Sequence, residues 1–285
     1  MSLDYHVVDV FTDRAFAGNP LAVVLDGSTL STVQMQAIAR EFNVSETTFV
    51  LPATTSEATY RLRIFTPVAE LPFAGHPSVG TAWLLRSLGV ISDGIAVQEC
   101  AAGLMPLAID GSQIELTGGE PTLSSDVDDI DSVLAAVGLA ATDAIGTPVR
   151  RAGCGLEWTY LHVGDAAVIR AAADPRELRG IDSAGVCLFS YADGRAHVRC
   201  FAADLGVPED PATGSAALGL GVFLVANGLL PGDGESTYVV TQGVEMGRPS
   251  TLHVTVRASG GAAEQVRVAG TAVSVASGRI NSPSE

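Results

Sequence analysis

Two segments of the chain repeat one local plan, and this repetition constrains the fold more than any other feature. One begins at Arg61 and reads RLRIFTPVAELPFAGHPSVGTAWLL; the other begins at Arg199 and reads RCFAADLGVPEDPATGSAALGLGVFL. Each shows a strand pattern, then a turn with an acidic residue, proline and glycine, and then a helix that is apolar on every side. A helix without a polar face must be buried. Each half of the chain is therefore predicted to contain a buried helix.

Shorter matches extend this repeat in both directions. QECAAG from Gln98 and QGVEMG from Gln242 follow the two helices, and glycine-led strands from Gly18 and Gly155 precede them. A repeat of such length indicates a duplicated domain rather than a solenoid. We expect an N-terminal lobe over residues 1–118 and a C-terminal lobe over 119–285, joined by a polar linker that begins at Thr117. Whether the last strand, 266–276, packs back on the N-terminal lobe is left open.

Hydrophobic alternation predicts that most of the remaining chain is strand, which places the protein in the α+β class. The buried helices are predicted at His76–Leu88 and Gly214–Asn227, and an amphipathic helix at Leu30–Phe42. Short helices are expected at Asp128–Val137 and Asp174–Leu178. Many strands with one dry helix per half favour a sheet curled around that helix, with the active site between the lobes.

Charge and composition narrow the possible partners. The net charge is −16, which argues against nucleic acid and against an anionic membrane surface. The four cysteines lack paired or metal-ligand spacing, so we expect no structural zinc and a reducing compartment. The N-terminus has no signal-like segment, so we expect a cytoplasmic protein. Pro211–Gly232 carries no charge over 22 residues, but its glycines and prolines favour a buried helix over a membrane span.

The buried helix starts are the first candidates for a functional site. The N–H groups and partial positive charge of a helix N-terminus bind carboxylates or phosphates. Glu46, His76 and Asp210 are the titratable residues of interest. From the residues alone, Glu46 is either an exposed turn carboxylate or a general acid/base. His76 either caps or packs the first helix or acts in a site, and Asp210 is either a plain N-cap or a site residue.

Other catalytic signatures are weak or missing from the sequence. It has no G-x-S-x-G motif, and Ser215 has no evident base beside it in sequence. GLGVF within the second helix lacks the context of a dinucleotide fingerprint. We see no Walker loop, EF-hand or zincin motif, and expect neither a metal nor a cofactor.

At these motifs the chain resembles the phenazine-biosynthesis isomerase family, called PhzF-like, within the diaminopimelate epimerase fold superfamily. The matching segments are DVFTDRAFAGNPLAV from Asp9, SETTFV from Ser45, FTPVAELPFAGHPSVGTA from Phe65, EDPATGSA from Glu209 and QGVEMGRPS from Gln242. They cover nearly the whole chain in order. The resemblance implies two pseudo-symmetric lobes, each a β-barrel-like sheet around a central helix. It also implies a cofactor-free isomerase and a homodimer.

The same resemblance assigns site residues. Glu46 matches the family's general acid/base. His76, Asp210 and Ser215 match its other catalytic residues. The helix starts match its carboxylate-binding turns, which assigns substrate binding to four residues: Gly75, Pro77, Thr213 and Gly214.

One departure separates the chain from the racemases of this superfamily, which place a cysteine at each helix start. Here Ala74 and Ala212 stand at those places, so a two-thiol mechanism is disfavoured. The resemblance implies proton transfer between carbons of a small carboxylate, such as a dihydro-hydroxyanthranilate, by a single glutamate. An amino-acid racemase or epimerase and a non-catalytic carboxylate-binding protein stay as alternatives.

Overall fold

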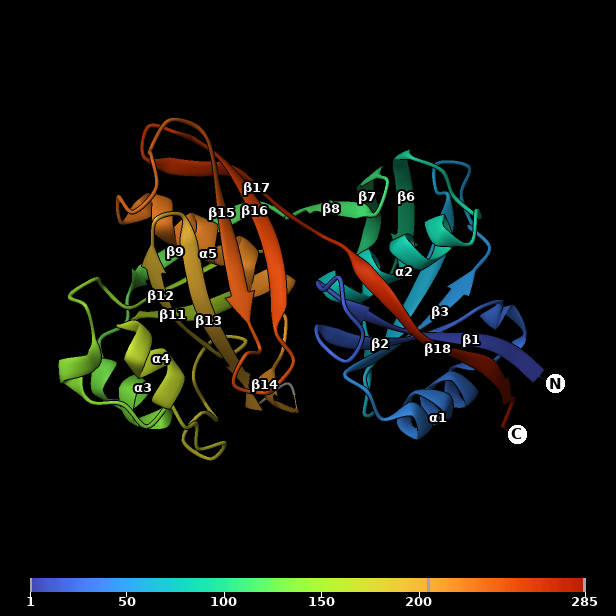
Figure 1. Ribbon diagram of the computed structural model, residues 1–285, viewed down its shortest axis with the longest axis horizontal. Helices are drawn as coiled ribbons and strands as arrows, with labels where there is room; N and C mark the ends of the chain where they lie inside the picture. Colours follow the sequence, from blue (N-terminus) through green and yellow to red (C-terminus); the bar gives the residue numbers. More distant parts are fainter. Residues whose placement is uncertain (1, 204–205, 284–285) are drawn as a thin grey trace. The chain divides into compact units, whose positions relative to one another are not determined.

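The computed structural model describes residues 2–203 and 206–283. The chain forms two compact units (Figure 1). Unit 1 consists of Met1–Leu116 with Ala269–Glu285, and unit 2 consists of Thr117–Val268. The C-terminal strand therefore belongs to the same unit as the N-terminal strand.

Unit 1 is built mainly from strands, several of which pack against the buried helix α2. Its strands are β1 (Ser2–Val10), β2 (Asn19–Val24), β3 (Glu46–Leu51), β4 (Tyr60–Phe65), β5 (Glu70–Leu71), β6 (Gly94–Cys100), β7 (Gly103–Asp110), β8 (Gln113–Thr117) and β18 (Ala272–Asn281). Strand β1 lies between β2 and β18 and pairs antiparallel with both (Figure 1). Its helices are α1 (Thr32–Phe42), α2 (Gly75–Ser87) and the 3-10 turn η1 (Gly27–Thr29).

Unit 2 has a similar inventory. Its strands are β9 (Pro121–Asp126), β10 (Arg150–Cys154), β11 (Glu157–His162), β12 (Val186–Ala192), β13 (Arg195–Ala202), β14 (Val207–Asp210), β15 (Gly234–Gln242), β16 (Ser250–Ser259) and β17 (Ala262–Gly270). Its helices are α3 (Ile130–Ala136), α4 (Asp165–Arg170), α5 (Gly214–Ala226) and the 3-10 turn η2 (Ala141–Asp143). Helices α3 and α4 share a core with Leu161, Leu188 and Phe201 of the sheet.

The two units pair their strands in the same order. In unit 1, β1–β2 is antiparallel, β2–β3 parallel, β3–β4 and β4–β5 antiparallel, β4–β6 parallel and β6–β7 antiparallel. In unit 2, the same sequence of directions joins β10, β11, β12, β13, β14, β15 and β16. The internal repeat predicted from the sequence is thus visible in the pairing. That each sheet closes into a barrel stays a prediction.

The amphipathic helix α1 follows directly from its sequence. Ser31 caps its N-terminus: the Ser31 hydroxyl accepts from the backbone N–H of Gln34, and the Gln34 side chain accepts from the N–H of Ser31. Met35, Ile38 and Ala39 are buried at helical spacing against the sheet, and Asn43 ends the helix in the left-handed conformation.

The two apolar helices are buried, as their composition predicts. Residues 76–82 of α2 and 216–225 of α5 are buried, while Trp83, Arg86 and Ser215 are partly exposed. α2 contacts β1, β2, β3, β7 and β18, and α5 contacts β9, β10, β11 and β16. The packing leaves little room: a Cβ at Gly219 would lie 2.5 Å from the Tyr160 hydroxyl and 2.8 Å from the Ala152 carbonyl oxygen.

Three expectations about local structure are wrong. The segment expected as a linker from Thr117 contains β9, which pairs with β10. Strand pairing uses backbone N–H and C=O groups, so a polar composition does not prevent it. Residues 174–178 form an isolated helical turn, in which Asp174 accepts from Arg176, and the helix of this region is α4. The expected last strand 266–276 is two strands, β17 and β18, which break at Thr271, whose carbonyl oxygen accepts from the Phe11 N–H.

Among the described residues, none of the helices combines the length and the apolar character that a membrane crossing would need. The uncharged segment 211–232 contains the 13-residue helix α5.

Candidate active site

Glu46 and His76 come together in unit 1 although they are 30 residues apart. Oε2 of Glu46 lies 3.3 Å from Nε2 of His76, and the two side chains are only 13% and 7% exposed. The contact is at ion-pair distance but is not aligned as a hydrogen bond. Glu46 is therefore a shielded strand residue and not an exposed turn carboxylate.

The local fold explains why these side chains meet. Glu46 is the first residue of β3, which runs parallel to β2 and pairs with Leu21. His76 is the second residue of α2. Asn19, at the start of β2, contacts the other ring nitrogen of His76: its Nδ2 is 3.3 Å from Nδ1 of His76, and its Oδ1 accepts from the Ser45 hydroxyl at 3.1 Å. Gly18 makes this entry possible, because it has φ +66° and a Cβ there would lie 2.3 Å from the Val10 carbonyl oxygen.

Burial decides the charge of His76. Removal from water lowers the pKa of His76 from its ordinary value of 6.5 to about 3. The start of a helix disfavours the imidazolium further. His76 is therefore neutral near pH 7 and faces Glu46 as a hydrogen-bonding group rather than as a cation.

A series of hydrogen bonds joins the start of α2 to the sheet. The buried Gln98 of β6 donates from Nε2 to the Ser78 hydroxyl at 2.9 Å, and Ser78 donates to the Ala74 carbonyl oxygen at 2.8 Å. The Tyr60 hydroxyl donates to Oε1 of Gln98 at 3.2 Å. Ala74 is the N-cap, and it makes no side-chain cap. Gly75 opens the helix and Pro77 has no N–H, so the first amides of this turn are those of Gly75 and His76.

Unit 2 presents Asp210 and Thr213 just before α5. Thr213, and not Asp210, is the N-cap, and no side-chain cap is made. The Thr213 hydroxyl donates to Oδ2 of Asp210 at 2.5 Å. Gln242, 1% exposed, accepts from the Thr213 N–H at 3.1 Å and donates to the Thr213 hydroxyl at 2.9 Å and to the Asp210 carbonyl oxygen at 2.7 Å. Asp210 is thus fixed by its neighbours and is not a simple helix cap.

Ser215 lies next to Gly214 in the first turn of α5 and is partly exposed. Trp158 of β11, 2% exposed, donates from its indole N–H to the Ser215 Oγ at 3.1 Å. Because an indole only donates, the Ser215 hydroxyl hydrogen must point to another acceptor. Ser215 is therefore arranged as a donor.

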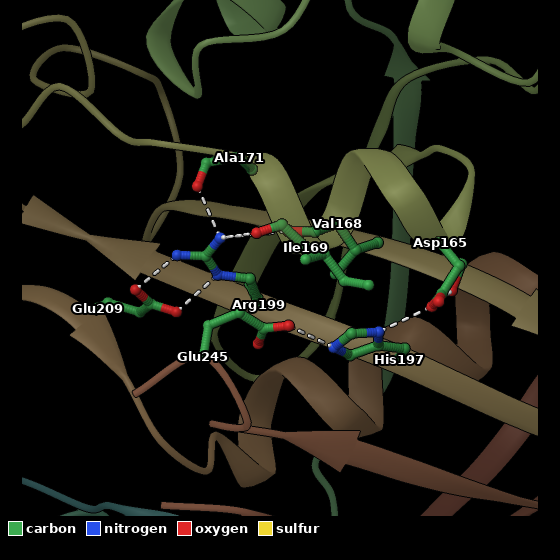
Figure 2. Close-up of polar contacts among 9 residues, drawn as sticks. Asp165, Val168, Ile169, Ala171, His197, Arg199, Glu209 and Glu245 are labelled. Atoms are coloured by element: carbon green, nitrogen blue, oxygen red, sulfur yellow. Dashed lines mark hydrogen bonds and ion pairs between the residues drawn. The ribbon is translucent and has the colours of Figure 1, made fainter. Parts of the chain in front are cut away.

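An arginine–glutamate pair supports the strand that leads into each helix. In unit 2, the guanidinium of Arg199 binds both carboxylate oxygens of Glu209 at 2.8 and 2.9 Å (Figure 2). It also donates to carbonyl oxygens at the end of α4, with Ala171 at 2.6 Å, and lies 5.0 Å from the centre of the Phe201 ring. Glu209 precedes Asp210, so this pair fixes the approach to the site.

Unit 1 repeats the same arrangement. Arg63 binds both oxygens of Glu70 at 2.7 and 2.6 Å and lies 5.2 Å from the centre of the Phe65 ring. In both units the arginine stands two residues before the phenylalanine, and the glutamate lies on the short strand before the helix. The presence of the same arginine–glutamate pair in both units supports the duplication inferred from the sequence.

A second group of charges lies beside Arg199. His197 of β13 contacts Asp165 through Nδ1 at 2.7 Å and Glu245 through Nε2 at 3.0 Å (Figure 2). Glu245 belongs to the turn after β15 that follows Gln242. This turn also packs on Pro211, since a Cβ at Gly243 would lie 2.6 Å from the Pro211 carbonyl oxygen. The contacts of His197 with Asp165 and Glu245 therefore help to fix the turn after β15, which packs on Pro211 just before α5.

No cysteine stands in the first turn of α2 or α5, although Cys200 of β13 pairs with Asp210 and contacts Thr213, the N-cap of α5. Cys100, Cys154, Cys187 and Cys200 are free and buried. Burial raises the pKa of Cys154 to about 12 and the pKa of Cys200 well above its ordinary value. Neither is a thiolate near pH 7.

The structure brings together Glu46 and His76 in unit 1, and Asp210, Thr213, Gly214 and Ser215 in unit 2. Sequence reasoning gave no role to four residues that hold them: Asn19, Gln98, Trp158 and Gln242. A signal was present for the glutamines, because both follow their helix in the repeat, and for Asn19, which lies in the GNP motif. Trp158 gave no such signal.

Comparison with known proteins assigns the chain to a family. The profile of the family described as phenazine biosynthesis-like protein matches residues 8–278. An uncharacterized isomerase of Mesorhizobium japonicum is 38% identical, over 97% of this chain and 98% of that protein. A trans-2,3-dihydro-3-hydroxyanthranilate isomerase of Pseudomonas aeruginosa is 36% identical, over 96% of this chain and 98% of that protein.

Solved structures agree in fold. A PhzF-family phenazine biosynthesis protein of Bacillus anthracis superposes with a TM-score of 0.89 and 26% identity, covering 99% of each chain. A hydroxyproline epimerase of Agrobacterium vitis shares the fold at 13% identity, with a TM-score of 0.64 over 98% of this chain and 92% of that one. The chain therefore belongs to the phenazine biosynthesis-like protein family, and like the two named relatives it is an isomerase.

Proposed function

We propose that this isomerase moves a proton between two carbons of a small unsaturated carboxylate, without a cofactor, and that Glu46 alone takes and returns the proton. The observation that carries the proposal is the shielded contact between Glu46 and a neutral His76. A carboxylate that is mostly removed from water and faces a neutral donor suits general acid–base work. The Pseudomonas aeruginosa relative supports a substrate of the dihydro-hydroxyanthranilate type.

The proposed reaction balances without an added reagent. The Glu46 carboxylate takes a proton from a carbon next to the substrate's double bonds, and the freed electron pair enters the system conjugated to the substrate carboxylate. The protonated Glu46 then returns the proton to another carbon, and the double bonds shift. The charge that develops on the conjugated carboxylate is stabilised by N–H donors and a positive helix end.

The helix starts supply those donors. Neither Ala74 nor Thr213 makes a side-chain cap. The turns at Gly75 and Gly214 are therefore our candidates for binding the carboxylate. Pro77 limits the donors of the first turn to the preceding amides, and Thr213 acts by holding Asp210.

The remaining site residues orient the substrate in this proposal. His76 and Asp210 bind a ring hydroxyl or amino group, and Ser215 donates a hydrogen bond, as the Trp158 contact favours. A barrel-like sheet around each central helix would keep these side chains in place. A homodimer and a cytoplasmic location stay predictions.

The amino-acid racemase alternative is disfavoured by the residues at the helix starts. Ala74 and Ala212 have no acid/base group, and the four cysteines are buried and stand on strands rather than in the helix starts. A non-catalytic binding protein is disfavoured because the chain keeps Glu46 in contact with His76 and has isomerases as relatives.

Solvent exchange tests the proposal even when the product has not been identified. The protein is incubated with a panel of small carboxylates, trans-2,3-dihydro-3-hydroxyanthranilate first, in deuterated water, and products are read by mass spectrometry and NMR. We expect a double-bond shift with deuterium incorporation for at least one cyclic diene acid, and neither with Glu46→Gln. Inversion at the α-carbon of an amino acid would favour the racemase instead. No exchange with any carboxylate that binds would favour the binding protein.

A further inference from the structure

Asn19 is a buried side chain that joins the proposed acid/base pair to the strand before it. It is 0% exposed and opens β2. Its amide bridges two neighbours: Nδ2 lies 3.3 Å from Nδ1 of His76, and Oδ1 accepts from the Ser45 hydroxyl at 3.1 Å. With Glu46 on the other ring nitrogen, a continuous polar chain runs from Ser45 through Asn19 and His76 to Glu46.

The direction of this chain follows from what each group can donate. An ionised Glu46 has only acceptor oxygens, so the facing Nε2 of His76 must carry the hydrogen. The ring is neutral, so its other nitrogen, Nδ1, then has a lone pair and must accept. The amide nitrogen of Asn19 only donates, which fits Nδ1, and the amide oxygen is left to accept from Ser45. One arrangement of hydrogens satisfies every contact in the chain.

This arrangement also controls where an abstracted proton can go. When Glu46 has taken a proton, it could pass that proton to His76 only if Nε2 had a lone pair. The change of tautomer would place a hydrogen on Nδ1 opposite the Asn19 NH2 group, with two donors facing each other. That cost keeps the proton on Glu46 until the substrate takes it back.

We propose that Asn19 is a positioning residue that fixes His76 as the Nε2–H tautomer, so that His76 presents a donor to the Glu46 carboxylate and cannot accept the proton that Glu46 removes. The part about the abstracted proton rests on the function proposed above, whereas the tautomer does not. Burial of His76 supports it, because the lowered pKa also closes the route through an imidazolium.

Nitrogen-15 NMR reads the tautomer directly, with no substrate present. The chain has five histidines, so His76 is assigned by its loss in His76→Gln. We expect Nδ1 at the shift of an unprotonated nitrogen and Nε2 at that of a protonated one from pH 6 to 8. Asn19→Asp keeps the size of the side chain but makes it an acceptor, so His76 lies between two carboxylates and we expect Nδ1 to carry a hydrogen in this variant. Asn227→Asp, at the end of α5, is the matched control and should leave the His76 signals unchanged.

Activity provides the second measurement. Asn19→Asp should keep the cooperative unfolding of the wild type but lower kcat by roughly 100-fold, with a smaller change in KM, because a wrongly oriented imidazole costs rate more than binding. The fraction of deuterium carried from substrate to product should also fall, since the proton now leaks through His76. A purely structural role for Asn19 would change stability and leave this fraction unchanged.

The outcomes separate the two proposals. A wild-type protein with the Nδ1–H tautomer overturns the inference whatever the variants do, as does an Asn19→Asp variant that folds and keeps Nδ1 unprotonated. If the tautomers are as expected but Glu46→Gln retains activity, the positioning by Asn19 stands and the proposed function fails. If Asn19→Asp does not fold, the wild-type spectrum still decides the tautomer.

Discussion

Gln98 and Gln242 hold the two central helices in the same way. Each is a buried glutamine on the strand that pairs parallel with the arginine-bearing strand of its unit, β4 or β13. Each donates from Nε2 to a hydroxyl at the start of the helix, Ser78 in α2 and Thr213 in α5. The helix starts are therefore tied to the sheet by side chains, which leaves their geometry little freedom.

We predict that replacement of Gln98 lowers the stability of the protein. Gln98→Leu keeps the approximate volume but removes the partner of the Tyr60 hydroxyl and of Ser78. We expect the free energy of unfolding in urea to fall by about 1–3 kcal/mol, because buried polar groups lose their hydrogen bonds. Adding Tyr60→Phe should recover part of that loss, since it removes one stranded hydroxyl. Additive losses in the double variant would show that the two side chains are not coupled.

The contact between Trp158 and Ser215 should affect substrate binding more than folding. Trp158→Phe removes the indole donor and leaves an aromatic ring in the core. We expect KM to rise by about 3- to 10-fold, because the Ser215 hydroxyl loses the donor that directs it toward a ligand. Tyr160→Phe is the matched control, since Tyr160 lies on the same strand and bonds the Ala216 carbonyl oxygen instead. An equal rise in KM for both variants would contradict the role of Ser215.

Burial of neutral His76 should make the protein sensitive to acid. The folded protein binds no proton at His76 until about pH 3, whereas the unfolded chain binds one below its ordinary pKa of 6.5. Unfolding therefore takes up a proton between these values, and stability falls as the pH falls from 6.5 toward 3. This one group contributes a slope of up to about 1.4 kcal/mol per pH unit.

His76→Gln should remove that slope from urea unfolding curves recorded between pH 7 and 4. His253→Gln removes an exposed histidine of β16 and serves as the control. Identical pH dependence in His76→Gln and wild type would mean that His76 titrates normally in the folded protein.

The thiols should be dispensable for catalysis. The four cysteines are buried, and burial holds Cys154 and Cys200 in the thiol form. A variant with all four changed to alanine is expected to lose stability, because the buried sulfur atoms fill core volume. Its kcat should stay within about threefold of wild type below its unfolding temperature. A folded variant without activity would return a cysteine to the mechanism.

The sequence predicted the fold where its pattern had only one physical solution. A helix apolar on every face must be buried, and α2 and α5 are. The amphipathic pattern of residues 30–42 predicts a helix, and α1 forms there with Ser31 and Gln34 as its capping box. Prediction from the sequence failed where the local composition of a segment indicates one structure and its pairing with a distant strand imposes another. Residues 121–126 have the polar composition of a linker, yet they form β9 because β10 offers an edge.

The site was predicted in part for the same reason. Glu46, His76, Asp210 and Ser215 stand in motifs and could be named. Their supports act across distant elements: Asn19 reaches His76 over 57 positions, as Trp158 reaches Ser215. Spacing in the sequence does not encode such contacts, and only the repeated glutamines and the GNP motif that contains Asn19 left a visible trace.

Glu46 as the single proton carrier is the central claim, and isotope transfer under single turnover tests it most directly. The substrate found in the exchange screen is labelled with deuterium at the carbon that loses its proton, and the product is analysed after one turnover in ordinary water. We expect a measurable fraction of the product to carry deuterium at the new position, because one shielded carboxyl group takes and returns the same hydron. Glu46→Gln should still bind the substrate but lower kcat by roughly 100-fold or more. Turnover by Glu46→Gln near the wild-type rate would contradict the account and make Asp210 or His76 the leading base.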